Sequence, residues 1–306
     1  MVAVSVQNLK KSYGKTDALK GVSFEVAKGE LFGIIGPDGA GKTSLFRILT
    51  TLLTANEGSA TVDGLDVVRD YKRIRSRVGY MPGRFSLYQD MTVEENLSFF
   101  ASVFGTTIQA NYRLIEDIYR QIEPFKKRRA GKLSGGMKQK LALCCALIHK
   151  PSVLFLDEPT TGVDPVSRKE FWQMLRRLQA QDITILVSTP YMDEAMLCDR
   201  IALIREGTFL TIDVPSRIVE DFKEPLFAVS SGNMSRLLSY LRRIPEVKSS
   251  YAFGDVHHVV LEGRASLSTL KSQLTESGFS DIEMYPITAT IEDYFLSFNA
   301  KTDNIT

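Results

Sequence analysis

Apolar and polar residues alternate at the start of the chain, and further along the apolar residues gather into short runs. Val2, Val4 and Val6 lie on one face of an extended segment, which is the two-residue period of a half-buried strand. The later runs are more continuous, as in strands that are buried on both faces. Further strands are therefore predicted at residues 19–26, 31–35, 61–67, 78–81, 153–156 and 183–188.

Helical periodicity occupies the stretches between these strands. Thr92 and Glu95 have the spacing of a capping box, in which both side chains accept backbone N–H groups at the start of a helix. The predicted helices cover residues 43–53, 93–104, 111–122 and 166–180 and the segment after Ser134. Strands that alternate with helices in this way predict an α/β fold with a mainly parallel sheet and helices on both sides.

The pattern changes after Thr211. Residues 213–215 interrupt it, and a second break at Pro225 is typical of a linker. The order that follows is strand, helix, strand, strand, helix, strand, which predicts a small α+β domain of the ferredoxin-like type. The strands are expected at 226–229, 250–253, 257–262 and 282–285, the helices at 235–243 and 267–277, and a closing helix at 290–298.

These patterns divide the chain into two domains. The first covers residues 1–212 and contains a helical subdomain at about 84–150, residues 213–225 form a linker, and the second domain covers 226–306. A length of 306 residues agrees with two domains, since single cores rarely grow beyond roughly 250 residues. The second domain shows no catalytic constellation, so we interpret it as a dimerisation or regulatory module.

Composition excludes several classes of function. The chain is 44% hydrophobic and 24% charged with a net charge of +2, so no nucleic-acid partner is expected. The basic clusters at 69–77 and 126–129 are interpreted as solvated faces. No apolar stretch approaches the roughly 20 residues of a membrane-spanning helix, and the first residues lack the apolar core of a secretory signal. The sequence therefore predicts a cytoplasmic protein.

The cysteines and histidines give no sign of a disulfide framework or a metal site. Cys144, Cys145 and Cys198 are few and lie in apolar or helical surroundings, so we expect reduced thiols in the core. The three histidines, which we expect at the surface, have no metal-ligand spacing with these cysteines. They are His149, His257 and His258.

The run 31–35 leads directly into a glycine-rich loop of the form G-x-x-x-x-G-K-T. Glycines in such a loop let successive backbone N–H groups turn inward around phosphate oxygens. Lys42 is expected to reach the β and γ phosphates, and Thr43 to offer its hydroxyl to Mg²⁺. The strand, loop and helix order supports this, because a helix N-terminus favours anions. The predicted nucleotide-binding loop is Gly36, Pro37, Asp38, Gly39, Ala40, Gly41, Lys42, Thr43 and Ser44.

Two later strings narrow the class of phosphate-loop protein. Residues 133–140 read LSGGMKQK, and residues 154–165 read LFLDEPTTGVDP. Together with the phosphate loop they resemble the ATP-binding subunits of ABC transporters, a resemblance that covers roughly residues 2–212. It implies the P-loop NTPase fold of the ABC ATPases, with ATP and Mg²⁺ as cofactors.

The resemblance also implies roles for single residues. Tyr13 matches the aromatic that stacks on adenine, and Asp157 matches the carboxylate that holds Mg²⁺. Glu158 matches the general base that polarises the attacking water. Asp164 matches the loop that communicates between two nucleotide sites.

A second anion site is predicted at the start of a helix. Its members, Ser134, Gly135 and Gly136, match residues that reach the γ phosphate held by a partner domain. The resemblance therefore implies that two ABC ATPase domains work head to tail.

Two positions depart from the family pattern. The family has glutamine where this chain has Gly83, and histidine where this chain has Pro190. Proline offers neither a side-chain donor nor a backbone N–H. Both missing groups sense the γ phosphate or its metal, so we expect slow or absent hydrolysis at this chain's own site, and pairing with a different, competent ABC ATPase domain. The alternative is that Thr189 or Arg84 replaces the missing groups.

The leading interpretation is a transport ATPase subunit that drives a separate membrane permease, and the string from Gly79 to Leu97 resembles a bacterial export group. Phe85, Leu87 and Tyr88 are candidates for an exposed apolar permease groove. A second interpretation is a regulatory subunit that binds ATP with little hydrolysis. A third is a soluble ABC ATPase of translation or DNA repair, which usually has tandem nucleotide domains or a long heptad insertion.

Overall fold

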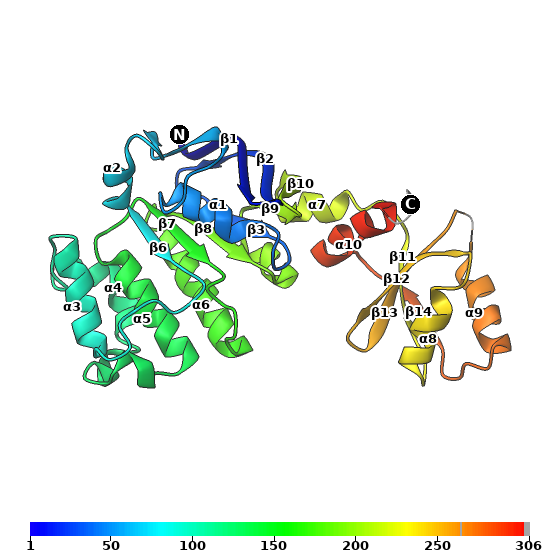
Figure 1. Cartoon of the computed structure of the whole chain (residues 1–306). Coiled ribbons are helices and arrows are strands. Elements are labelled where there is room, and N and C mark those ends of the chain that lie inside the picture. Colours follow the sequence, from blue (N-terminus) through cyan, green and yellow to red (C-terminus); the bar gives the residue numbers. More distant parts are fainter. Residues whose placement is uncertain (264, 303–306) are drawn as a thin grey trace. The chain divides into compact units, whose positions relative to one another are not determined.

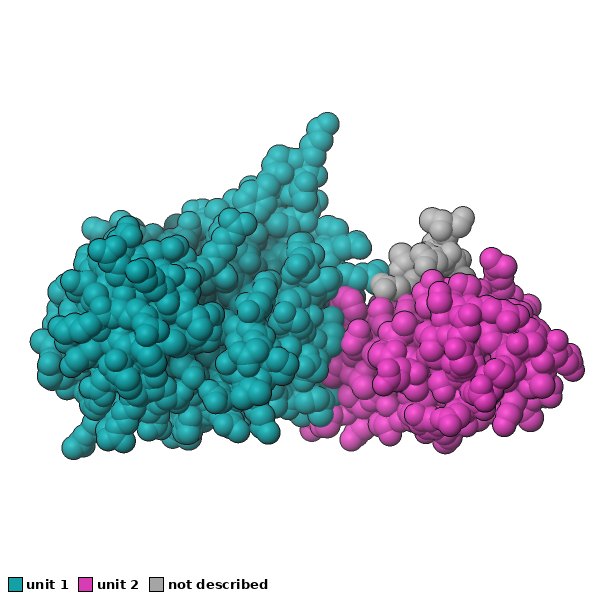
Figure 2. Space-filling view, turned by 90° about the horizontal axis from the view of Figure 1, so that it is seen from below, with its two compact units in different colours: residues 1–215 teal, residues 216–306 magenta. Residues whose placement is uncertain are grey.

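The chain folds into two compact units, drawn in teal and magenta in Figure 2. A computed structural model describes residues 1–263 and 265–302. The first unit is Met1–Pro215 and the second is Ser216–Thr306. No described helix is both long enough and apolar enough to span a bilayer.

A six-stranded sheet forms the centre of the first unit (Figure 1). Its order is β10-β9-β3-β8-β7-β6, and all neighbours pair in parallel except β10 with β9. The mainly parallel sheet predicted from the sequence is thus confirmed. The strands are β3 (Leu31–Ile35), β6 (Val78–Met81), β7 (Val153–Asp157), β8 (Thr184–Thr189), β9 (Arg200–Arg205) and β10 (Thr208–Asp213).

A second sheet of the first unit is antiparallel and has the order β2-β1-β4-β5. Its strands are β1 (Val2–Tyr13), β2 (Thr16–Ala27), β4 (Glu57–Val62) and β5 (Leu65–Asp66). The single strand predicted at 61–67 was wrong, because the chain turns at Asp63 and Gly64, which both have positive φ. Apolar side chains from both sheets join in one core around Phe46 and Phe155, whose rings meet edge to face.

Helices connect the strands of the first unit. They are α1 (Lys42–Leu49), α2 (Tyr71–Arg75), α3 (Val93–Val103), α4 (Tyr112–Tyr119), α5 (Gly135–Leu147) and α6 (Pro165–Gln179), with short 3₁₀ turns η1 (Glu123–Phe125), η2 (Ala130–Lys132) and η3 (Met192–Leu197). The capping box of Thr92 and Glu95 is confirmed, since each side chain accepts the other residue's N–H. Helix α7 (Pro215–Glu220) begins where β10 has ended.

The second unit contains a four-stranded antiparallel sheet of order β12-β13-β11-β14. Its elements follow the predicted order and are β11 (Leu226–Ser230), α8 (Met234–Leu241), β12 (Val247–Phe253), β13 (Val256–Leu261), α9 (Leu267–Glu276), β14 (Glu283–Pro286) and α10 (Ile291–Thr302). Leu237 and Leu270 on the two helices pack with Val259 of the sheet in one core. This strand order is that of a ferredoxin-like fold.

The predicted burial of the cysteines is confirmed, whereas the surface position predicted for one histidine is not. The cysteines are free and buried, as predicted, and burial raises the pKa of all three thiols. The surface position predicted for His257 was wrong, because it is only 3% exposed. Its Nε2 lies 2.7 Å from the carbonyl oxygen of Met234.

The loop between β6 and α3 is fixed by a fully buried amide, that of Asn96. Its Nδ2 donates to the carbonyl oxygens of Tyr88 and Thr92 at 2.9 Å each, and to that of Met91 at 3.3 Å. Its Oδ1 accepts the N–H of Tyr88 at 3.0 Å. This one side chain thus makes four hydrogen bonds to the backbone around the start of α3.

We expect Asn96→Ala to lower the free energy of unfolding by roughly 2 kcal/mol, because buried backbone groups lose their partners. Unfolding in urea can be followed by the fluorescence of Trp172, the single tryptophan of the chain. Ser98→Ala, at an exposed position of the same helix, is the control and should change the value by less than about 0.5 kcal/mol. Equal effects of the two substitutions would contradict the role of the buried amide.

Candidate functional site

The glycine-rich loop 36–41 follows β3 at the carboxyl edge of the central sheet. Gly36 is packed so closely that a Cβ atom there would lie 2.1 Å from the carbonyl oxygen of Ile204, and at Gly41 it would lie 2.2 Å from that of Ala18. Gly39 and Gly41 have positive φ, which favours glycine. Side chains at positions 36 and 41 would therefore collide with the backbone of neighbouring segments.

Helix α1 begins directly after the loop, and Gly41 at its N-cap has no side chain to cap the first turn. The first N–H groups of a helix have no partner within the helix. They are therefore available to an anion, which the helix dipole also favours. The backbone arrangement fits a bound phosphate.

Lys42 lies at the centre of this loop and is buried. Its Nζ donates to the carbonyl oxygens of Gly36 at 2.7 Å and Pro37 at 2.9 Å. The same ammonium lies 3.1 Å from Oε1 of Glu158. The structure thus brings the predicted phosphate-binding cation and the predicted general base into contact.

Asp157 ends β7 as a buried carboxylate, and Glu158 follows it. The hydroxyl of Ser188 donates to Oδ1 of Asp157 at 2.6 Å and accepts the N–H of Glu158 at 3.1 Å. Glu158 has a φ of 50°, which is unfavourable for a residue with a side chain and is often found at functional sites. Ser188 was not among the predicted site residues, although a short polar residue at the end of a buried strand marks its position.

The donor set fits Mg²⁺ better than a transition metal. The described residues contain no group of three or more His, Cys, Asp or Glu side chains that could hold a metal alone. Mg²⁺ is usually bound by one or two carboxylates together with substrate phosphates and water. Asp157 and the hydroxyl of Thr43, at the start of α1, would supply such protein oxygens.

Tyr13 lies at the end of β1 and is 47% exposed. Its hydroxyl lies 3.2 Å from Oγ of Ser44, and the Nζ of Lys11 lies 5.4 Å from its ring centre. The predicted adenine-stacking residue is therefore beside the phosphate loop and exposes part of its surface.

Ser134 caps α5, and its Oγ accepts the N–H of Met137 at 3.4 Å. Gly136 faces the first turn of α6, since a Cβ atom there would lie 3.1 Å from Oγ of Ser167. Among the described residues, no hydrogen bond or ion pair joins Ser134, Gly135 or Gly136 to the loop 36–43. Within the described residues, the structure therefore does not join the predicted second anion site to the chain's own phosphate loop.

Asp164 is the N-cap of α6, the helix whose first turn faces Gly136. Its Oδ1 accepts the N–H of Ser167 at 3.0 Å. This backbone hydrogen bond lowers the pKa of Asp164.

Tyr80, in β6, lies near the buried Asp157. Burial and the nearby Asp157 carboxylate raise the pKa of Tyr80 to about 12.

Gly83, the first departure from the family pattern, lies beside the backbone of Asp157 and Cβ of Glu158. A Cβ atom there would lie 3.0 Å from the carbonyl oxygen of Asp157 and 3.7 Å from Cβ of Glu158. Gly83, Arg84, Gly135 and Glu158 all line a cavity of about 210 Å³. Within the described part of the chain, the exposed side chain of Arg84 makes no hydrogen bond or ion pair.

Near Gly83, Phe85 is partly exposed and Tyr88 is exposed, in line with the predicted apolar groove. The exposure predicted for Leu87 was wrong, since only 8% of its surface is accessible. Leu87 instead lines an apolar cavity of about 250 Å³ together with Tyr80, Phe100 and other residues.

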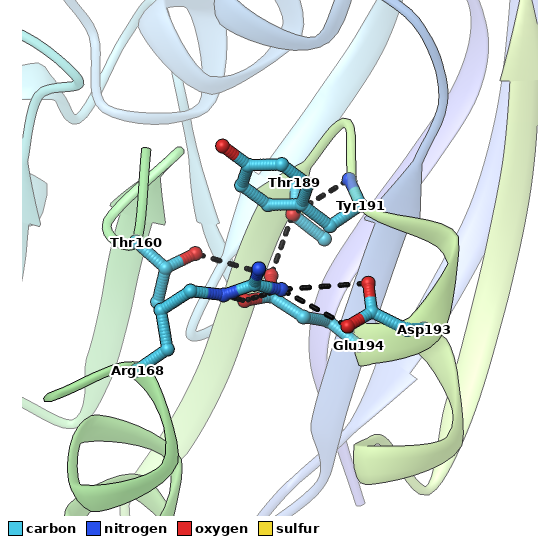
Figure 3. A network of polar contacts seen from close by, with 6 residues as sticks. All are labelled: Thr160, Arg168, Thr189, Tyr191, Asp193 and Glu194. Carbon is cyan, nitrogen blue, oxygen red and sulfur yellow. Dashed lines mark hydrogen bonds and ion pairs between the residues drawn. The ribbon is translucent and has the colours of Figure 1, made fainter. Parts of the chain in front are cut away.

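Pro190, the second departure, follows the end of β8. The hydroxyl of Thr189 accepts the N–H of Tyr191 at 3.1 Å and donates to Oε2 of Glu194 at 2.6 Å (Figure 3). Thr189 is fully buried and its donor is already used. Of the two residues considered as substitutes for the missing groups, Thr189 therefore has its hydroxyl engaged within the fold, whereas Arg84 has an exposed side chain.

Comparison with known proteins agrees with these features. The ABC transporter family model matches residues 19–161. The chain is 37% identical over 302 residues to the probable multidrug ABC transporter ATP-binding protein YbhF of Escherichia coli (strain K12). The matched region covers 96% of this chain. The chain spans 51% of the length of that relative.

A second relative is matched over most of its length. The chain is 36% identical to the Nod factor export ATP-binding protein I of Rhizobium sp. (strain N33), a match that covers 88% of this chain and 93% of the relative. A solved ATP-binding subunit of an ABC transporter superposes with a TM-score of 0.66 at 26% identity and covers 72% of this chain and 93% of its own. The chain therefore belongs to the ATP-binding proteins of ABC transporters.

Proposed function

We propose that this chain binds MgATP at its own phosphate loop and closes around it with a second ABC ATPase domain to drive a membrane permease. The observation that carries the proposal is the buried Lys42 ammonium, held between the loop carbonyls and Glu158. A γ phosphate beside Lys42 would lie next to the residue that polarises the attacking water. Bound Mg²⁺ would neutralise phosphate charge, with Thr43 and Asp157 as its protein ligands.

Two domains are needed because one chain supplies the two anion sites in separate places. Tyr13 and the loop 36–44 would hold the nucleotide from one side. Ser134, Gly135 and Gly136, at the start of α5, would reach the γ phosphate on the partner. Asp164 follows the general base by only six positions and starts the helix that faces Gly136, so it is suited to link the two sites.

Hydrolysis at the chain's own site is proposed to be slow. Gly83 offers no side chain beside Asp157 and Glu158, and Pro190 offers no donor. Losing one preorganised donor commonly costs on the order of 10² to 10³ in rate, although two losses in one unit need not multiply. The intact second anion site could still complete a competent site on a different chain, which favours a heterodimer.

A regulatory subunit that binds ATP with little hydrolysis is the second candidate. The engaged hydroxyl of Thr189 favours it, because this residue does not replace the missing histidine. The exposed Arg84 beside Glu158 is the group that would preserve an active enzyme instead.

Export is the proposed direction of transport. The names of the two relatives, a probable multidrug ABC transporter protein and a Nod factor export protein, support it. We place the chain on the cytoplasmic face of the membrane, bound to a separate permease through the apolar cavity near Leu87.

We further propose that residues 1–212 form the nucleotide-binding domain, with its helical subdomain at about 84–150. Residues 213–225 then serve as the linker and 226–306 as a dimerisation or regulatory domain.

We expect the double substitution Gly83→Gln with Pro190→His to raise ATP turnover by about tenfold or more, because it restores two groups that sense the γ phosphate. Phosphate release should be measured for the purified chain and for the chain with the ATPase that copurifies from detergent-solubilised membranes. Gly83→Ala with Pro190→Ala is the matched control, since it changes both backbones but adds no sensor. Wild-type turnover equal to that of the restored variant would contradict the slow-site proposal.

A substitution of Arg84 distinguishes an active site in which Arg84 replaces a missing sensor from a site with slow hydrolysis. If Arg84 senses the γ phosphate, Arg84→Gln should lower wild-type turnover by roughly tenfold or more while nucleotide affinity changes little. If the site is degenerate, the low wild-type rate should not change.

MgATP should draw two domains together when water attack is disabled by Glu158→Gln. Sedimentation of the variant chain, alone and mixed with the copurifying ATPase, should show association that needs both ATP and Mg²⁺. Adding Lys42→Ala should abolish it by removing the phosphate contact, and Ser134→Ala should weaken it. A variant chain that stays monomeric in both samples would contradict the proposal that two ABC ATPase domains close around MgATP.

A further inference from the structure

A buried carboxylate, that of Glu194, lies at the centre of a polar network beside the nucleotide site (Figure 3). Glu194 is on the turn η3 and is only 2% exposed. Its Oε2 accepts the hydroxyls of Thr160 at 3.1 Å and Thr189 at 2.6 Å, and its Oε1 accepts Nε of Arg168 at 3.1 Å. A buried charge is tolerated only when it is paired and hydrogen-bonded, so these three donors are required by the carboxylate.

The three donors come from three different segments of the first unit. Thr160 follows the general base Glu158 by two positions. Thr189 is the last residue of β8. Arg168 is in the first turn of α6, whose N-cap is Asp164. The side chain of Glu194 therefore connects the segment after Glu158, the turn at Pro190 and the first turn of α6. We call the loop that precedes α6 and ends at Asp164 the partner-facing loop, because the proposed function places it toward the second ABC ATPase domain.

Backbone contacts extend this network to the phosphate loop. The carbonyl oxygen of Thr189 accepts the N–H of Gly36, the first glycine of the loop, at 3.2 Å. The carbonyl oxygen of Glu158 accepts the N–H of Thr161 at 3.2 Å. The phosphate loop, Thr189 and Glu194 are thus connected in series by two hydrogen bonds.

The guanidinium of Arg168 is held from several sides. It lies 3.1 Å from Oδ2 of Asp193 as well as from Glu194, and 4.2 Å from the ring centre of Tyr191. The N–H of Tyr191 donates to the hydroxyl of Thr189 and closes the turn over Pro190. Arg168 and the turn at Pro190 are therefore joined to the same carboxylate, that of Glu194.

We propose that Glu194 is a positioning residue that couples the nucleotide on the phosphate loop to the partner-facing loop at Asp164. The inference rests on the proposed function, because it assumes that MgATP binds at residues 36–44. Among the described residues, no hydrogen bond or ion pair joins Glu194 to the loop 36–44 or to the carboxylates of Asp157 and Glu158. It acts by fixing the distances between Thr160, Thr189 and the first turn of α6.

The experiment compares hydrogen exchange of the full chain with and without MgATP, in the wild type and in Glu194→Gln. Glutamine keeps the shape and one acceptor but loses the charge that holds Arg168. In the wild type, MgATP should slow exchange at 36–44 and at 160–168 by about threefold or more. In Glu194→Gln the slowing at 36–44 should remain, and the slowing at 160–168 should fall to less than half.

Arg176→Gln is the matched control, because it removes an ion pair with Asp199 at the other end of α6. This control should keep the wild-type response at 160–168. A purely structural role of Glu194 would lower the melting temperature and raise exchange without MgATP, but would leave the MgATP-dependent difference unchanged. Thr160→Val, which removes one hydroxyl donor and keeps the side-chain shape, is the second variant should Glu194→Gln fail to fold. It should reduce the response at 160–168 in the same direction.

Two results would overturn the inference. One is an undiminished MgATP response at 160–168 in both Glu194→Gln and Thr160→Val. The other is an equal loss in Arg176→Gln. Failure of the proposed function looks different, because the wild type itself would then show no slowing at 36–44.

Discussion

The site depends on one constraint of the parallel sheet, which places the carboxyl ends of neighbouring strands at one edge. The strands β3, β8 and β7 are adjacent there, so the segments that follow them are brought together although they are far apart in the sequence. These segments carry the phosphate loop, the turn at Pro190 and the pair Asp157 and Glu158. No single element supplies the chemistry, and the register of the sheet sets the distances.

The close packing of the phosphate loop follows from the same edge. The loop leaves β3 next to β9, and the carbonyl oxygen of Ile204 in β9 fills the space that a side chain at position 36 would need. The ammonium of Lys42 then satisfies the inward carbonyls of Gly36 and Pro37. The glycine spacing, the lysine and the neighbouring strand β9 therefore fit together sterically in one small space.

The sequence predicted the elements that carry strong local signals, such as β6, the capping box of α3 and the phosphate loop. It missed β9 and β10, although residues 201–204 form an apolar run of the same kind as the strands that were predicted. The split of 61–67 into two strands depends on the turn at Asp63 and Gly64, an Asp-Gly pair that is itself a local turn signal and was overlooked. Leu87 and His257 were assigned to the surface because burial of a loop residue or a histidine is decided by distant packing partners.

The polar contacts of the site were the least predictable feature, and Glu194 shows why. Its sequence context is an ordinary acidic turn, and an isolated glutamate is expected at the surface. It is buried because three donors from separate segments converge on it, and convergence is a property of the fold alone. Such a residue also explains how Pro190 is accommodated, since Thr189 and Tyr191 fix the turn through Glu194 without a donor from position 190. The turn after β8 can thus keep its geometry without a side-chain donor at position 190.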